Sequence, residues 1–109
     1  DPDIYIVNKG KLAESLAIAL SRKLSNFDLV TELDLSGSSF SRQFKKANKC
    51  NAKSVVVIGD EEAKKKEFSI KLFSNSNESK NELSIAIDDN VKLEEWVLKN
   101  LNLNMSNKK

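Results

Sequence analysis

Hydrophobic positions in the first third of the chain alternate between strand-like and helix-like patterns. Residues 4–7 (IYIV) form a continuous β-prone run, as expected for a strand buried on both faces. Leucines then recur every four residues from Leu12 to Leu24, and Asn8 stands where it can cap the helix that this period predicts. Residues 29–35 (LVTELDL) alternate apolar and polar side chains, which is typical of a strand.

A second helix is predicted after the Ser/Gly-rich loop of residues 36–39. Phe40, Phe44 and Ala47 fall on one face of this helix at about 100° per residue, and Ser39 is the expected N-cap. We expect this apolar face to pack against the sheet.

The rest of the chain adds three strands and one helix. Strands are predicted at residues 54–60, 68–73 and 83–87, a charged turn at 61–67, a polar hairpin loop at 74–82, and a last helix capped by Asp88, Asp89 or Asn90 with Leu93, Trp96, Val97 and Leu101 on its apolar face. The order β-α-β-α-β-β-β-α predicts an α/β domain, with three α/β/α layers around a mixed five-stranded sheet. Residues 1–109 are expected to form one domain, with a core of about 4–101 and a polar tail at 102–109.

The composition is that of an ordinary globular domain, with 39% apolar and 31% charged residues. The absence of histidine and the single cysteine exclude Ser-His and Cys-His nucleophile pairs and most zinc sites, so no catalytic residue, metal site or cofactor is expected in this chain. No apolar run is long enough to span a bilayer, and no membrane partner is expected. Because the sequence opens without Met and soon enters an apolar run, we expect it to be part of a longer protein.

Positive charge is concentrated on the second helix, although the net charge is only +2. Arg42, Lys45, Lys46 and Lys49 share the face opposite the phenylalanines, and no acidic residue within 42–53 can pair with them. An ordinary solvated helix face is one interpretation, but the single sign of the charge favours an anionic partner. The preceding serines place hydroxyl and N–H donors at the positive end of the helix dipole, which also suits anions.

Polar residues also follow the first two strands, at the edge where ligand sites form in open α/β sheets. Asn8 and Lys9 end the first strand, and Asp34 lies near the end of the second, next to the Ser/Gly loop. A helix cap explains Asn8 equally well. Glu32 either faces solvent, which is the simpler interpretation, or accepts hydrogen bonds from base amino groups.

Residues 37–62 (GSSFSRQFKKANKCNAKSVVVIGDEE) resemble the C-terminal anticodon-binding domain of histidyl-tRNA synthetases. That family carries a stretch of the form G-x-S-[LF]-x-x-Q-[LF]-K-x-A-D-K-x-x-A, followed by an apolar strand and G-[DE]-x-E. The matching residues are Gly37, Ser39, Phe40, Gln43, Phe44, Lys45, Ala47, Lys49, Ala52, Gly59, Asp60 and Glu62. The likeness extends over residues 4–101 and departs from the pattern at Asn48, at residues 50–51 and in the loop at 74–82.

The resemblance implies an α/β/α sandwich that binds the tRNA anticodon loop, while a separate catalytic domain joins histidine to the tRNA. It implies that ATP and Mg²⁺ act in that other domain, that the parent protein is a cytoplasmic homodimer, and that the partners of this domain are tRNA and the parent's catalytic domain. The residues expected to bind tRNA are Asn8, Lys9, Glu32, Asp34, Ser38, Ser39, Arg42, Gln43, Lys45, Lys46 and Lys49.

Each class of side chain in this set suits one part of a single-stranded loop. Asn8, Glu32 and Gln43 are suitable readers of base edges, and the four cations of the second helix suit phosphates. The phenylalanines fit the core, so the guanidinium plane of Arg42 is the expected stacking surface.

Two alternatives remain open at this stage. The same domain can serve a synthetase paralogue that uses it for protein contacts, with a regulatory rather than a ligase function. It can also be a plain interaction domain whose basic helix is only solvated. The sequence upstream of Asp1 would separate an active enzyme from an inactive paralogue.

Overall fold

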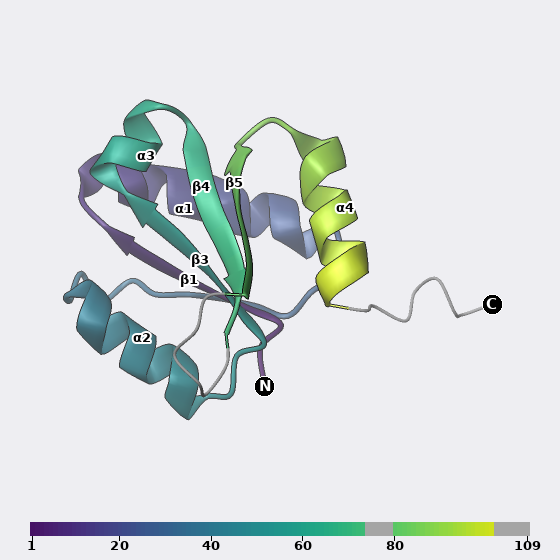
Figure 1. The fold of residues 1–109 in the computed structure, drawn as a ribbon. Coiled ribbons are helices and arrows are strands. Elements are labelled where there is room, and N and C mark those ends of the chain that lie inside the picture. The colour runs from purple at the N-terminus through teal and green to yellow at the C-terminus, as the bar shows by residue number, and fades with distance from the viewer. Residues whose placement is uncertain (74–79, 102–109) are drawn as a thin grey trace.

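The computed structural model describes residues 1–73 and 80–101, which build one five-stranded sheet with helices on both faces (Figure 1). In chain order the elements are β1 (Ile4–Lys9), α1 (Lys11–Ser25), β2 (Thr31–Leu33), α2 (Phe40–Lys49), β3 (Ser54–Gly59), α3 (Asp60–Lys64), β4 (Glu67–Leu72), β5 (Lys80–Ala86) and α4 (Asn90–Asn100). The five strands and three helices that were predicted follow one another in the predicted order, with β5 beginning earlier than expected and one further helix, α3, between β3 and β4. Residues 74–79 of the predicted loop and the predicted tail at 102–109 lie outside the described residues.

Helix α3 is an addition to the predicted order, because its residues were expected to form only a turn. The Glu62 carboxylate accepts a hydrogen bond from the Gly59 N–H at 2.8 Å, which caps the start of this helix. Acidic residues in the first turn also complement the helix dipole. The acidic residues at the start of the charged segment are therefore a helix N-terminal signal, which the prediction of a turn overlooked.

The sheet has the strand order β2-β1-β3-β4-β5 and is mixed, as predicted. β1 pairs in parallel with β2 and with β3, whereas β4 runs antiparallel to both β3 and β5. Helix α1 connects β1 to β2 and helix α2 connects β2 to β3, so the parallel strands are joined by helical crossovers, whereas β3 leads through the short helix α3 to β4. The carboxyl ends of β1, β2 and β3 consequently meet at one edge.

The edge strand β2 is much shorter than its predicted span of residues 29–35. Leu29 is buried in the larger core, but Val30 and Leu35 are 61% and 64% exposed, so the apolar residues of the alternating pattern do not all face a core. The strand ends after Leu33, where the Asp34 carboxylate accepts the Ser36 N–H at 2.9 Å and closes a turn. A local polar contact thus overrides the alternation.

Alternate residues of β1 supply the hydrophobic cores on the two faces of the sheet. Ile4 and Ile6 belong to the larger core, together with residues of α1, α3 and α4. Tyr5 and Val7 belong to a smaller core, which they form with α2. Figure 1 shows α2 alone on one face of the sheet and α1 and α4 on the other, so the three predicted layers are confirmed.

Helix α1 buries a different stripe from the one that its leucine repeat suggested. Ala13, Ala17, Leu20 and Leu24 are fully buried, whereas Leu12 is 51% exposed. Leu12 lies about 100° around the helix from Ala13, outside the stripe that the other four share. The small alanines let α1 lie close to the sheet, so they and not Leu12 define its inner face.

Asn8 was predicted to cap the start of α1, but this role belongs to Asp60, the residue that follows β3. Asn8 is a buried residue of β1, and the N-cap position is Gly10, which has no side chain to offer. The Asp60 Oδ1 atom, which follows β3, accepts a hydrogen bond from the Ala13 N–H at 3.1 Å. Gly10 has φ of 115°, and a Cβ atom there would lie 2.1 Å from the same Asp60 oxygen. Glycine is therefore required at position 10.

Replacing Asp60 with alanine is predicted to destabilise the protein, because the first turn of α1 loses the acceptor for an N–H group. We expect Asp60→Ala to lower the free energy of unfolding by about 1 kcal/mol in urea titrations. The matched control is Glu61→Ala, which removes an exposed carboxylate from the same turn of α3 and should have a smaller effect. Equal losses for the two variants would contradict the proposed cap.

Candidate nucleic-acid interface

Helix α2 sits on the sheet through the apolar face that the sequence predicts. Ser39 is its N-cap and accepts a hydrogen bond from the Arg42 N–H at 3.2 Å, which confirms the predicted helix start. Ala47 is fully buried, and the half-buried rings of Phe40 and Phe44 pack onto the smaller core. The orientation of this helix determines where its remaining side chains point.

The four cations of α2 form what we call its cationic face, made of Arg42, Lys45, Lys46 and Lys49. All four side chains are exposed, and none of them makes an ion pair with another described residue. One of these cations, Lys46, interacts with the Asp34 carboxylate, and its charge helps to lower the pKa of Asp34. Four unpaired charges of one sign on one helix face attract anions.

Gln43 lies on the inner side of α2, and its side chain is fully buried. Its Oε1 accepts the N–H of Asn8 at 2.8 Å, and its Nε2 donates to the carbonyl of Asn8 at 2.8 Å and to that of Ser38 at 2.8 Å. Both amide protons are thereby used. Gln43 therefore joins α2 to the end of β1 and to the Ser/Gly loop, and it is not placed to read a base edge.

Asp34 is also buried, and its hydrogen bonds to Tyr5 and Asn8 hold the end of β2 to β1. Its carboxylate accepts hydrogen bonds from the Tyr5 hydroxyl at 2.7 Å and from the Ser36 hydroxyl at 2.5 Å, in addition to the Ser36 N–H. Its main-chain carbonyl accepts the Asn8 Nδ2 at 2.9 Å. Tyr5, Asn8, Asp34 and Gln43 together form what we call the buried polar cluster.

The electrostatics of this cluster keep Asp34 ionised and Tyr5 neutral. Burial disfavours the Asp34 carboxylate, but the hydrogen bonds from Ser36 and Tyr5 and the charge of Lys46 outweigh it and lower the pKa of Asp34. Burial, followed by the hydrogen bond to Asp34 and its negative charge, raises the pKa of the Tyr5 phenol. At neutral pH a negative charge therefore lies close enough to the cationic face to interact with Lys46.

The Ser/Gly loop is held by contacts to the end of β1 and within itself. The Lys9 Nζ donates to the Gly37 carbonyl at 3.0 Å, and the hydroxyls of Ser36 and Ser38 lie 2.8 Å apart. Gly37 has φ of 70°, the left-handed conformation that favours glycine. The loop thus has a defined shape next to the start of α2.

The predicted site residues lie at the carboxyl ends of β1 and β2, in the Ser/Gly loop and along α2, and they differ in exposure. The exposed residues are Lys9, Glu32, Ser39, Arg42, Lys45, Lys46 and Lys49; Ser38 is half-buried; and Asn8, Asp34 and Gln43 are buried. Glu32 pairs in register with Tyr5 on the face that α2 covers. The predicted set did not include Tyr5 and Ser36, which both donate hydrogen bonds to Asp34. Side chains alternate along a strand, so the sequence could have shown that Tyr5 lies on the other face of β1 from Ile4 and Ile6.

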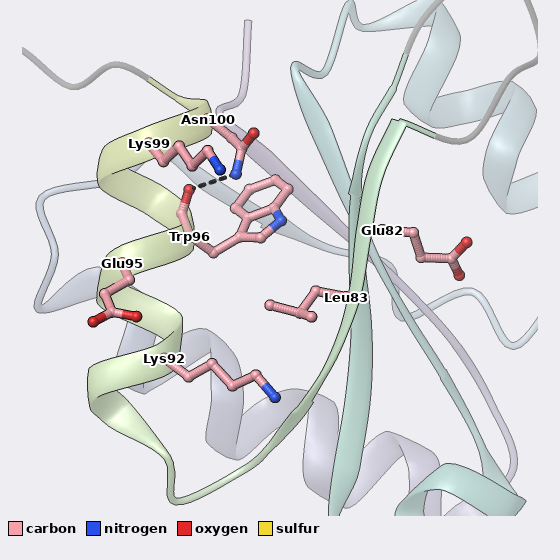
Figure 2. Close-up of a pocket in the computed structure, with 7 residues that line it drawn as sticks. All are labelled: Glu82, Leu83, Lys92, Glu95, Trp96, Lys99 and Asn100. Atoms are coloured by element: carbon pink, nitrogen blue, oxygen red, sulfur yellow. Dashed lines mark hydrogen bonds between the residues drawn. The ribbon is translucent and has the colours of Figure 1, made fainter.

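A pocket of about 350 Å³ lies elsewhere, between β5 and α4 (Figure 2). Leu83 and Trp96 point toward each other across it, and the remaining lining residues are Glu82, Lys92, Glu95, Lys99 and Asn100. None of the predicted tRNA-binding residues lines this pocket. Within the described residues, His, Cys, Asp and Glu side chains nowhere gather in threes that could hold a metal ion. No helix within residues 1–73 and 80–101 is long and apolar enough to cross a membrane.

Comparisons with known proteins agree with this arrangement. A family model for the anticodon binding domain matches residues 3–95. The chain is 63% identical over 101 residues to a protein named histidine–tRNA ligase from Prochlorococcus marinus subsp. pastoris, and the match covers 93% of this chain and 24% of that protein. It spans only about a quarter of the length of such relatives.

Two solved structures share the fold. Apo histidyl-tRNA synthetase of S. aureus matches with a TM-score of 0.69 and 27% identity, over 85% of this chain and 26% of that chain. Histidyl-tRNA synthetase from Nostoc sp. PCC 7120 matches with a TM-score of 0.71 and 22% identity, over 89% of this chain and 22% of that chain. The α/β fold predicted from the order of elements is therefore one that synthetases use.

Replacing Gln43 with leucine is predicted to destabilise the protein without changing the size of the side chain greatly. The N–H and carbonyl of Asn8 and the carbonyl of Ser38 would lose their partner, and we expect the free energy of unfolding to fall by roughly 2–4 kcal/mol. Ser41→Ala, on the exposed side of the same helix, is the control and should change stability by less than about 0.5 kcal/mol. Similar stabilities for the two variants would contradict the bridging role of Gln43.

Removing the Tyr5 hydroxyl is predicted to raise the pKa of Asp34, because the ionised carboxylate loses a hydrogen bond. An NMR titration of the Asp34 carboxyl carbon in Tyr5→Phe should show this shift. Since the folded-state pKa of Asp34 lies below its unfolded value of about 3.9, its contribution to stability is present above that pH and is lost as the pH falls through the folded-state pKa. Tyr5→Phe should therefore lose stability at a higher pH than the parent, and an unchanged Asp34 pKa would refute the contact.

Proposed function

The chain belongs to the anticodon binding domain family, and we propose that it is the anticodon-loop-binding module of a histidine–tRNA ligase. The observation that carries the proposal is the cationic face of α2, which is exposed, of a single sign and unpaired among the described residues. The high identity to proteins named histidine–tRNA ligase supports the choice of amino acid.

The geometry suggests a division of labour between exposed and buried residues. Arg42, Lys45, Lys46 and Lys49 contact phosphates of the anticodon stem-loop, with Lys9, Ser38 and Ser39 nearby at the start of α2. Asn8, Asp34 and Gln43 hold α2 and the loop in place and do not touch bases themselves. Glu32 remains the exposed side chain suited to accept hydrogen bonds from a base edge.

In this proposal the joining of histidine to the tRNA takes place in another domain, outside residues 1–109. We propose that residues 1–109 form one domain of a longer protein, with a core of about 4–101. The catalytic domain of that protein binds ATP, Mg²⁺ and histidine, and the whole enzyme acts in the cytoplasm as a homodimer. The present domain has no reacting group to contribute and instead positions the tRNA.

Binding of a histidine-tRNA anticodon stem-loop is predicted to depend on the cationic face and on salt. Lys45→Glu/Lys46→Glu should weaken binding and reduce the slope of log affinity against log salt by roughly 0.7–0.9 for each phosphate that the protein no longer neutralises. Titrations at several salt concentrations measure both quantities. A loop of scrambled sequence should bind less tightly if bases are read.

The matched control is Lys64→Glu/Lys65→Glu, which reverses two exposed charges at the end of α3. It changes the net charge by the same amount and should leave the affinity and the salt slope nearly unchanged. Absence of binding by the parent chain at low salt, to the stem-loop and to full tRNA, would overturn the proposed function. Equal effects of the two double variants would show that α2 has no special role.

A further inference from the structure

Two aromatic rings meet where α2 borders the sheet, outside the predicted site. The rings of Phe44 and Phe73 have centroids 6.3 Å apart and planes only 17° from parallel, and both side chains are half-buried. The Lys71 Nζ lies 5.4 Å from the centroid of the Phe44 ring. The Phe73 N–H donates to the Lys53 carbonyl at 3.0 Å, so the residue continues the β3–β4 ladder and has a fixed position.

The face of β4 and β5 beside this ring pair is polar. Glu67, Ser69 and Lys71 alternate with the buried Phe68 and Ile70, so they share the face on which α2 lies. On β5, the Ser84 hydroxyl lies 3.4 Å from the Glu67 carboxylate, which places it on the same face. Helix α2 packs on the smaller core of β1 and β3 and meets this polar face at Lys71, whose ammonium lies over the Phe44 ring.

We propose that Phe44 and Phe73 form a stacking platform for an unpaired base of the anticodon loop. Phe44 belongs to the helix that carries the cationic face, and the exposed Lys45 is its neighbour in sequence, so one strand of RNA can contact both surfaces. Aromatic rings on a sheet face are how several RNA-binding folds hold splayed bases, and Phe44 and Phe73 are partly accessible at the border of such a face.

The platform rests on the proposed function and extends it to a second surface. It also replaces Arg42 as the stacking surface expected from sequence, because the phenylalanines are not all core residues. Phe68 is fully buried and Tyr5 nearly so, whereas the Phe44–Phe73 pair lies at the border of the smaller core. The occupant is a nucleobase and not an apolar peptide, because the surroundings are polar and carry an ammonium group.

The test compares Phe73→Leu with Phe27→Leu in the 109-residue chain. Phe27 is a half-buried ring that packs against the larger core on the other face of the sheet, so the two variants remove the same atoms. We expect Phe73→Leu to weaken stem-loop binding about tenfold without changing the salt slope, and Phe27→Leu to bind like the parent. Phe73→Tyr keeps the aromatic face and should bind within about twofold of the parent.

A direct readout uses stem-loops with 2-aminopurine at single loop positions, whose fluorescence falls on stacking. One position should be quenched by the parent and by Phe73→Tyr but much less by Phe73→Leu at saturating protein. If Phe73→Leu binds and quenches like the parent while Lys45→Glu/Lys46→Glu weakens binding, the platform is wrong and the proposed function stands. If the parent chain binds no RNA, both proposals fall. Circular dichroism melting confirms that each variant is folded.

Discussion

The buried amide of Gln43 is the contact on which the arrangement of this end of the molecule depends. It satisfies both main-chain groups of Asn8 and the carbonyl of Ser38, so one side chain links a strand, a loop and a helix. Leaving these buried polar groups without partners would be costly, and the geometry is therefore much more specific than apolar packing alone would make it. The direction in which α2 presents its cations follows from this link.

A buried carboxylate that is ionised at neutral pH lies near a positively charged surface in this domain. Asp34 stays ionised because Ser36 and Tyr5 donate to it, and Lys46 lies close enough to favour its charge. That carboxylate offsets part of the repulsion among the cations of α2 without occupying any of them in an ion pair. The helix can thus keep a concentrated charge for a partner while the fold remains stable.

The elements of the fold could be predicted from the sequence because local periodicity determines them. The five strands, the helices α1, α2 and α4, and the N-cap at Ser39 are of this kind, whereas the short helix α3 was not predicted. The pattern could not show that Gln43 points inward, because its polarity is balanced by partners far away in the chain. The pattern also missed the exposure of Leu12, which depends on how α1 packs on the sheet, and the early end of β2, where a local contact between Asp34 and Ser36 overrides the alternation. Of the candidate site, the cationic face was predictable, but the division into buried and exposed residues was not.

The capping of α1 by Asp60 joins groups 47 positions apart in the chain. During synthesis from the N-terminus, α1 is therefore made long before the carboxylate that completes its first turn. Asp60 directly follows β3, so the helix receives its cap only when β3 has also been made and can pair with β1. Closure of this edge of the sheet must wait until more than half of residues 1–109 have been made, which makes it a non-local step in the folding of this domain.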